Sequence, residues 1–270
     1  AFQYIFFYLQ ERFSGLVLLL GLTILNVNGN VAASTVALQS DWIGNPAIVE
    51  ARLISAVTGT GNLKDLPLGL EFRLAPGWKI YWRTPGEAGL PPTIEIWVDG
   101  SPVKAMINWP IPERFNVFGF DNFGYEKSVI LPVDVSGYDQ GSTVRLRGKL
   151  GAMACKDICM PLAGIVELMV PRGTAEASVY AQAIARSAAL VPRKGTGPSL
   201  KVVKVWQAEK VLYIRFKKLI RIDDIFIEGI KGVVFKKPRL EGADAVIAID
   251  GDEWPNLIGR TVTTTIIAGD

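Results

Sequence analysis

The sequence predicts an all-β protein made of two antiparallel β-sandwich domains, and three observations lead to this prediction. Many short segments alternate apolar and polar residues with period 2, as half-buried strands do. Gly, Pro, Asp and Asn separate these segments, as in TPGEAGLPP (84–92) and VDGSP (98–102). Only one long segment has the composition of a helix. Short, regularly spaced strands without alternating helices are typical of sandwiches.

The first domain is predicted over residues 35–172. Its clearest strand is LPLGLEFRL (66–74), in which every second residue is Leu or Phe and the residues between are Pro, Gly, Glu and Arg. That pattern gives the strand one buried and one solvated face. Further strands are expected at 78–83, 93–98, 128–135, 143–150 and 164–170.

A helix and linker are predicted at 173–197, followed by a second β-sandwich domain at 198–270. The helix is expected at 174–190, with Thr174 as its N-cap and Pro192 just beyond its end. Strands of the second domain are expected at 200–206, 210–216, 223–230, 244–250 and 259–267. This domain has no cysteine and no converging catalytic residues, so we expect a structural or docking module.

The N-terminal residues 1–33 are predicted to be a signal peptide. The apolar run from Gly15 to Leu25 is too short to span the ~30 Å hydrocarbon core of a bilayer as a helix. It fits the hydrophobic region of a secretory signal, with Val31, Ala32 and Ala33 as the cleavage site. The alternative is an uncleaved anchor. Either interpretation places the rest of the chain outside the cytoplasm.

Composition excludes several kinds of site. The 270 residues include no histidine, which rules out a Ser-His-Asp triad, a Cys-His nucleophile and a His-ligated zinc. The 29 basic and 26 acidic residues are interspersed and give a net charge of +3. The basic clusters at 216–218 and 235–239 are interpreted as solvated edges. No basic stripe with interleaved aromatics is present, so nucleic-acid binding is not expected.

The segment MACKDICMP (153–161) holds both cysteines, Cys155 and Cys159, between Met153 and Met160. The pair could be a structural staple, a metal site or a redox centre. As a staple it would close a very short loop, worth about 2 kcal/mol of chain entropy against about 3 kcal/mol for a 15-residue loop. Redox exchange is therefore favoured over stapling. A metal site stays an alternative, because two thiolates and two thioethers form a soft donor set suited to Cu(I).

Four ordered motifs carry a resemblance to a known family: GWKIYWRTPGEAGLPPTI (77–94), WPIPERF (109–115), FGYEKSVILPV (123–133) and CKDICMP (155–161). Together they resemble the N-terminal periplasmic region of DsbD-type thiol:disulfide interchange proteins, and most closely the suppressor-of-copper-sensitivity B branch. The resemblance covers about residues 40–172. It implies an immunoglobulin-like fold, and the branch carries two such domains before its membrane part.

The resemblance also implies roles for individual residues. Cys155 and Cys159 would be the redox pair, with Cys159 as the nucleophile. Residues 114–125 occupy the position of a cap loop, in which Phe118 would shield the cysteines. Tyr81 matches a tyrosine near the pair. Some family members have acidic residues before the cap aromatic, but here Asn116 and Val117 take those places, so carboxylate assistance is not carried over.

The expected function is that of a periplasmic thiol:disulfide exchange module, a protein-disulfide reductase unit. It would take electrons from a membrane-embedded thiol relay domain and pass them to oxidised thioredoxin-like partners. No flavin, haem or other cofactor is implied. Family members continue into a membrane domain, so we expect this sequence to be a piece of a longer protein or a detached module. The alternatives are a copper-binding or copper-tolerance protein using the Cys/Met cluster, and a structural adaptor with a stapled hairpin.

Overall fold

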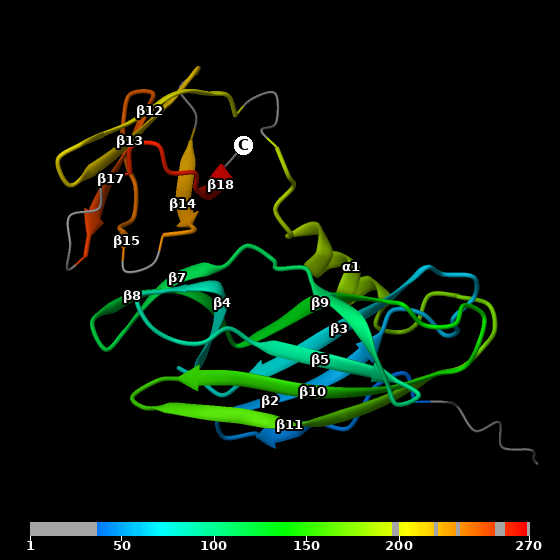
Figure 1. Cartoon of the computed structure of the whole chain (residues 1–270). Helices are drawn as coiled ribbons and strands as arrows, with labels where there is room; N and C mark the ends of the chain where they lie inside the picture. The colour runs from blue at the N-terminus through cyan, green and yellow to red at the C-terminus, as the bar shows by residue number, and fades with distance from the viewer. Residues whose placement is uncertain (1–36, 196–199, 219–220, 231–232, 252–256, 269–270) are drawn as a thin grey trace, which may run out of the picture. The chain divides into compact units, whose positions relative to one another are not determined.

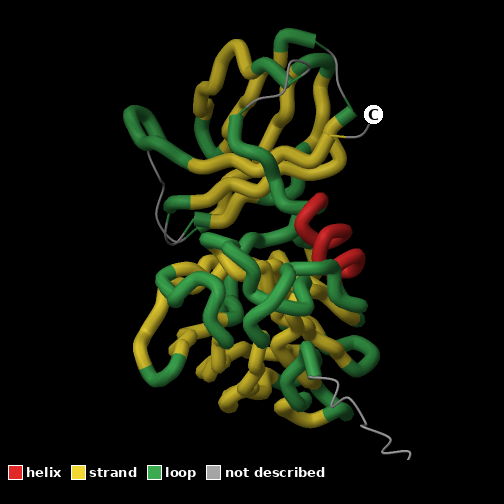
Figure 2. Tube along the Cα trace, turned by 90° about the vertical axis from the view of Figure 1, so that its right-hand side faces the viewer, coloured by secondary structure: helices red, strands yellow, loops and turns green. Residues whose placement is uncertain are grey.

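The structure is a computed structural model that describes residues 37–195, 200–218, 221–230, 233–251 and 257–268. The predicted signal peptide (1–33) and residues 196–199 of the predicted linker lie outside this described part. Within it the chain is built of strands and loops with one helix (Figures 1 and 2). No helix among the described residues is long and apolar enough to cross a membrane.

All strands of the described chain up to residue 170 join one antiparallel sheet. Their bounds are Ile43–Asn45 (β1), Val49–Ser55 (β2), Asp65–Leu74 (β3), Lys79–Gly86 (β4), Thr93–Val98 (β5), Ser101–Ile107 (β6), Glu113–Val117 (β7), Phe120–Glu126 (β8), Ser128–Ser136 (β9), Val144–Cys155 (β10) and Cys159–Val170 (β11). The strand order is β1-β2-β3-β9-β6-β5-β10-β4-β8-β7, and β11 pairs with β10. All of these pairings are antiparallel.

The sheet packs its two halves against each other around one core. Strand β6 joins the halves, because it pairs with β9 on one side and with β5 on the other. Inward side chains of both halves then share a single apolar cluster, which is consistent with an immunoglobulin-like sandwich. Its fully buried large members include Leu53, Leu66, Leu68, Leu70, Phe72, Ile80, Trp82, Leu131 and Leu150. The alternation in 66–74 therefore predicted β3 and its buried face correctly.

The helix begins later than predicted. Helix α1 spans Ala181–Ala189, and Thr174 is not its N-cap. The residues before it pair with the backbone beyond β2 instead: Thr58 N–H donates to the Glu176 carbonyl and Ser178 N–H to that of Ala56, each at 2.9 Å. This pairing with a distant segment overrides the local helical propensity of the first turns.

Helix α1 covers the outer side of the sheet. Its Ile184 lies over Gly69 of β3, where an added Cβ would come within 2.9 Å of the Ile184 side chain. Ser187 donates a hydrogen bond to the carbonyl of Ile130 in β9. These contacts hold the helix against β3 and β9.

The strands after the helix form smaller antiparallel sheets, which we call the second β region. Their bounds are Val202–Ala208 (β12), Val211–Phe216 (β13), Ile222–Glu228 (β14), Val234–Phe235 (β15), Arg239–Glu241 (β16), Asp244–Asp250 (β17) and Thr263–Ala268 (β18). Strands β12, β13, β15, β16 and β17 pair together, and β14 pairs with β18. This region has its own apolar cluster, which includes Leu212, Ile225 and Ile247.

One residue of the second β region belongs to the core of the first sheet. Phe226 in β14 is 1% exposed and packs in the first cluster, 5.7 Å from Trp82 and 4.9 Å from Phe123 between ring centroids.

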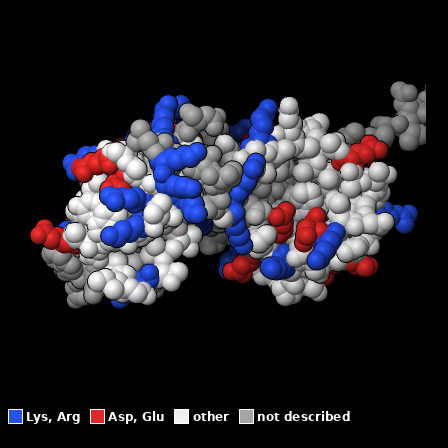
Figure 3. Space-filling model, turned by 90° about the horizontal axis from the view of Figure 1, so that it is seen from above, with Lys and Arg blue, Asp and Glu red and all other residues white. Residues whose placement is uncertain are grey.

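By their contacts, the described residues fall within one compact unit. The division into domains at 35–172 and 198–270 stays a prediction. Both signs of charge occur on the face drawn in Figure 3.

Candidate functional site

The two cysteines face each other at the closed end of the β10–β11 hairpin. Cys155 ends β10, Cys159 begins β11, and the two are direct partners in the antiparallel ladder. Their sulfur atoms form a disulfide. Three residues close the turn, where Lys156 N–H donates to the Ile158 carbonyl at 3.0 Å. The long ladder thus presents the disulfide at its tip.

The two sulfur-bearing residues differ in their access to solvent. Cys155 is 0% exposed and forms a small buried cluster with Tyr81, Phe115 and Val117, against which Met153 packs. Cys159 is exposed. A molecule that approaches the disulfide therefore reaches Cys159, while the protein covers Cys155.

Tyr81 lies in the buried cluster around Cys155. Strand β4 runs next to β10, with Ile80 opposite Ala154 and Lys79 opposite Cys155. The Tyr81 ring is 5.9 Å from that of Phe115 between centroids. Burial raises the pKa of its phenol, so Tyr81 stays neutral at physiological pH.

Gly89 fixes the position of the Tyr81 ring. Its φ is +100°, and a Cβ at this position would come within 2.3 Å of the ring. The loop TPGEAGLPP therefore closes on Tyr81 only because residue 89 has no side chain.

The predicted cap loop is a tight β-hairpin formed by β7 and β8. Phe118 and Gly119 form its turn with φ values of 58° and 86°, and positive φ at both positions is typical of a type I′ turn. In β7, Phe115 and Val117 face the cysteines, while Arg114 and Asn116 alternate with them. One face of the hairpin thus covers Cys155.

Phe118 does not take part in that cover. Its side chain lies at the tip of the hairpin and is 56% exposed, outside the buried cluster around Cys155. In this structure Phe115 and Val117 cover Cys155. A role for the Phe118 ring in shielding the exposed Cys159 stays a prediction.

The four sulfur donors proposed for Cu(I) are not gathered on one face. Met153 packs against the cluster of Cys155, but Met160 is the ladder partner of Ala154. Successive strand residues point to opposite faces, so Met160 faces away from the cysteine pair. Among the described residues no group of three or more His, Cys, Asp or Glu side chains could hold a metal ion.

Sequence reasoning singled out Phe118 in the cap segment and gave Phe115, Val117 and Gly89 no individual role at the site. The sequence does indicate that Phe115 and Val117 share one apolar face, since residues two apart on a strand point to the same side and both are apolar. Nothing in the local sequence indicates that this face meets Cys155, because that contact joins segments forty residues apart.

Comparison with known proteins agrees with this geometry. Residues 53–171, which include Tyr81, the β7–β8 hairpin and both cysteines, match the family described as thiol:disulfide interchange protein DsbD, N-terminal. The crystal structure of the N-terminal periplasmic domain of ScsB from Proteus mirabilis aligns with a TM-score of 0.67 at 23% identity. That alignment covers 86% of this chain and 94% of the other, and at this identity it shows a shared fold.

A comparison with the curated proteins gives no match. The family match covers all four motifs in full and most of the chain over which the sequence resembled DsbD-type proteins, so that resemblance is confirmed. Residues 53–171 of this chain are a domain of the DsbD N-terminal type.

Proposed function

We propose that this chain is a thiol:disulfide exchange module that passes electrons through Cys155 and Cys159 to oxidised partners of thioredoxin-like fold. The observation that carries the proposal is the asymmetry of the pair: Cys159 is exposed, and Cys155 is buried beside it in the same disulfide. A structural staple needs no such asymmetry. A relay does, because one sulfur must meet the partner while the other resolves the intermediate.

The exchange balances within the two protein thiols and the partner disulfide. In the reduced pair, the Cys159 thiolate attacks one sulfur of the partner disulfide and forms a mixed disulfide, and the other partner sulfur leaves as a thiolate. Cys155 then attacks the Cys159 sulfur, which releases the second partner sulfur and forms the Cys155–Cys159 disulfide present in the structure. Two electrons pass to the partner, and a further dithiol must reduce the pair again.

The proposal places this exchange in the periplasm, with a membrane-embedded thiol relay domain as the electron donor. The similar ScsB structure is that of a periplasmic domain. The predicted signal peptide agrees with that location. We also propose the suppressor-of-copper-sensitivity B branch, because the shared fold extends over 86% of this chain and includes the second β region.

Single-cysteine variants test the proposal. Cys155→Ser keeps the exposed thiol and lacks the resolving one, so it should accumulate a mixed disulfide with an oxidised thioredoxin-like protein that keeps one active-site cysteine. Cys159→Ser should trap little, because its remaining thiol is buried. Non-reducing gels measure the adduct. Equal trapping by both variants, or trapping by Cys159→Ser alone, contradicts the assignment of Cys159 as the nucleophile.

A further inference from the structure

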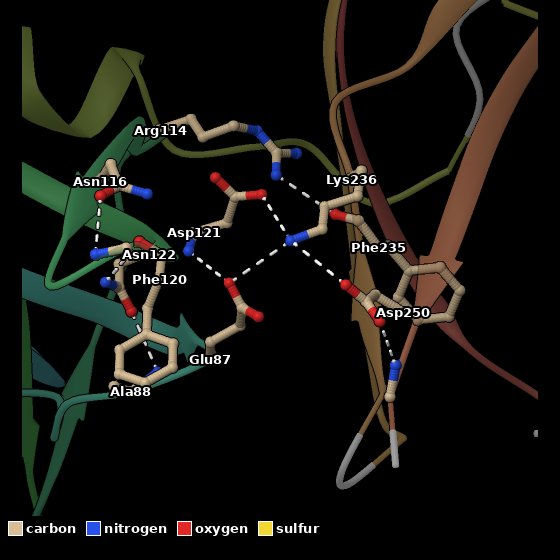
Figure 4. Close-up of polar contacts among 12 residues, drawn as sticks. Glu87, Ala88, Arg114, Asn116, Phe120, Asp121, Asn122, Phe235, Lys236 and Asp250 are labelled. Carbon is tan, nitrogen blue, oxygen red and sulfur yellow. Dashed lines mark hydrogen bonds and ion pairs between the residues drawn. The ribbon is translucent and has the colours of Figure 1, made fainter. Parts of the chain in front are cut away.

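The β7–β8 hairpin has a second face, and this face is bound by the second β region. Arg114 precedes Phe115, so its side chain leaves β7 on the side opposite to Cys155. Its guanidinium donates two hydrogen bonds of 3.0 Å to the two carboxylate oxygens of Asp224. A further bond of 3.2 Å reaches the Phe235 carbonyl (Figure 4).

This pair is shielded from water. The side chains of Arg114 and Asp224 are only 11% and 10% exposed. The guanidinium also lies 4.7 Å from the ring centroid of Phe123 and 5.5 Å from that of Phe226. The Asp224 carboxylate accepts the N–H of Ile225 at 2.7 Å, which fixes its direction. A bidentate, buried Arg–carboxylate pair restrains geometry more strongly than an exposed ion pair does.

Strand β8 is attached to the second β region as well. The Lys236 ammonium lies 3.1 Å from Asp121 and 3.6 Å from Glu87, and 3.8 Å from Asp250 of its own region (Figure 4). Burial opposes the charge of Lys236, but the hydrogen bond to Asp121 and the three carboxylates outweigh it and raise its pKa. Lys236 therefore keeps its positive charge throughout the neutral pH range.

We infer that the second β region is a clamp on the hairpin that covers Cys155, with Arg114 and Asp224 as its positioning pair. The hairpin lies between Cys155 and the second β region. Phe115 and Val117 contact Cys155, and Arg114 and Asp121 contact the second β region. Releasing the clamp frees the hairpin to move off Cys155 and makes the resolving thiol reactive toward small molecules. This inference rests on the proposed function of the pair, and it gives the second β region a role in that function.

The test measures which thiol reacts in the reduced, full-length chain. Native protein is treated briefly with iodoacetamide, and peptide mass spectrometry gives the ratio of Cys155 to Cys159 alkylation. Asp224→Asn removes the charge that holds Arg114 and should raise this ratio several-fold. Arg114→Lys keeps the charge but loses the bidentate geometry, and should raise the ratio less.

Glu228→Gln is the matched control. Glu228 also joins the second β region to the first sheet, but it accepts from Arg83 at 2.7 and 2.8 Å and from Thr84 at 2.8 Å, both in β4. Glu228 does not hold the hairpin, so the ratio of Cys155 to Cys159 alkylation in Glu228→Gln should stay close to that of the parent protein. A denaturant melt of each variant establishes that it is folded, and Arg114→Lys decides the outcome if Asp224→Asn does not unfold cooperatively.

Two results would overturn the clamp: an unchanged ratio in a folded Asp224→Asn or Arg114→Lys protein, or an equal rise in Glu228→Gln. Alkylation needs no partner protein, so the clamp and the exchange function fail separately. If the ratio rises while Cys155→Ser traps no partner, the proposed function is wrong and the clamp stands. If trapping succeeds and the ratio stays constant, only the clamp is wrong.

Discussion

At the scale of single residues, Phe115 and Phe118 stand three positions apart and have different surroundings. Phe115 is 9% exposed and packs with Cys155, whereas Phe118 is 56% exposed at the hairpin tip. The resemblance to the family indicated one shielding aromatic in this loop, but the side of the hairpin on which each ring lies depends on the turn. Because the turn falls at Phe118 and Gly119, Phe118 leaves the face that covers Cys155.

Alanine variants of the two rings should separate shielding from packing. Phe115→Ala removes a buried ring and should cost about 3–5 kcal/mol of stability while exposing Cys155. Phe118→Ala should cost much less, and if the ring shields Cys159 it should speed oxidation of the reduced pair several-fold. The measurements are a denaturant melt and the rate of thiol loss with a small disulfide reagent.

The shielding role of Phe118 would be refuted by an oxidation rate equal to that of the parent protein. The cover assigned to Phe115 would be refuted if Phe115→Ala lost stability without any rise in the alkylation of Cys155.

At the scale of elements, the β7–β8 hairpin depends on a close approach of β8 to β4. Gly124 in β8 is the partner of Tyr81, and a Cβ there would lie 1.9 Å from the carbonyl oxygen of Ile80. The backbone of β4 cannot move away easily, since β4 also pairs with β10 beside Cys155. The absence of a side chain at residue 124 therefore sets the position of the whole hairpin.

Gly124→Ala should push β8 away from β4 and destabilise the protein by about 1–3 kcal/mol, the usual range for overpacking. It should also raise the alkylation of Cys155, because the hairpin carries Phe115. Gly151→Ala is a suitable control, since its Cβ would meet only the Thr93 hydroxyl, at 3.0 Å. A Gly124→Ala protein as stable as Gly151→Ala would show that the hairpin does not depend on this contact.

Elements with local signals were predictable, and elements decided by distant contacts were not. The predicted strands 66–74 and 93–98 correspond to β3 and β5, because alternation is a property of the strand itself. The predicted start of α1 was wrong, because residues 174–178 pair with a segment more than a hundred positions earlier in the sequence. The motifs pointed to the cysteine pair, to Tyr81 and to residues 114–125. They did not indicate that Phe115 and Val117 are the hairpin side chains that line Cys155.

At the scale of the whole molecule, the second β region does more than follow the first sheet in sequence. It contributes Phe226 to the first core and binds β4, β7 and β8 through Glu228, Asp224 and Lys236. These partners are separated by more than a hundred positions and form no local pattern. The sequence could therefore predict a second set of strands but not that it meets the hairpin over Cys155.

We propose that Cys155 and Cys159 exchange electrons and are neither a staple nor a copper site. The most direct test is the reduction potential of the pair in the full chain, measured in thiol redox buffers with and without Cu(I). We predict a potential above about −300 mV, in the range of exchange-active disulfides, with no change on adding Cu(I). A potential far below about −300 mV would identify a structural disulfide, and tight stoichiometric binding of Cu(I) by the reduced pair would identify a metal site; either result would contradict the account.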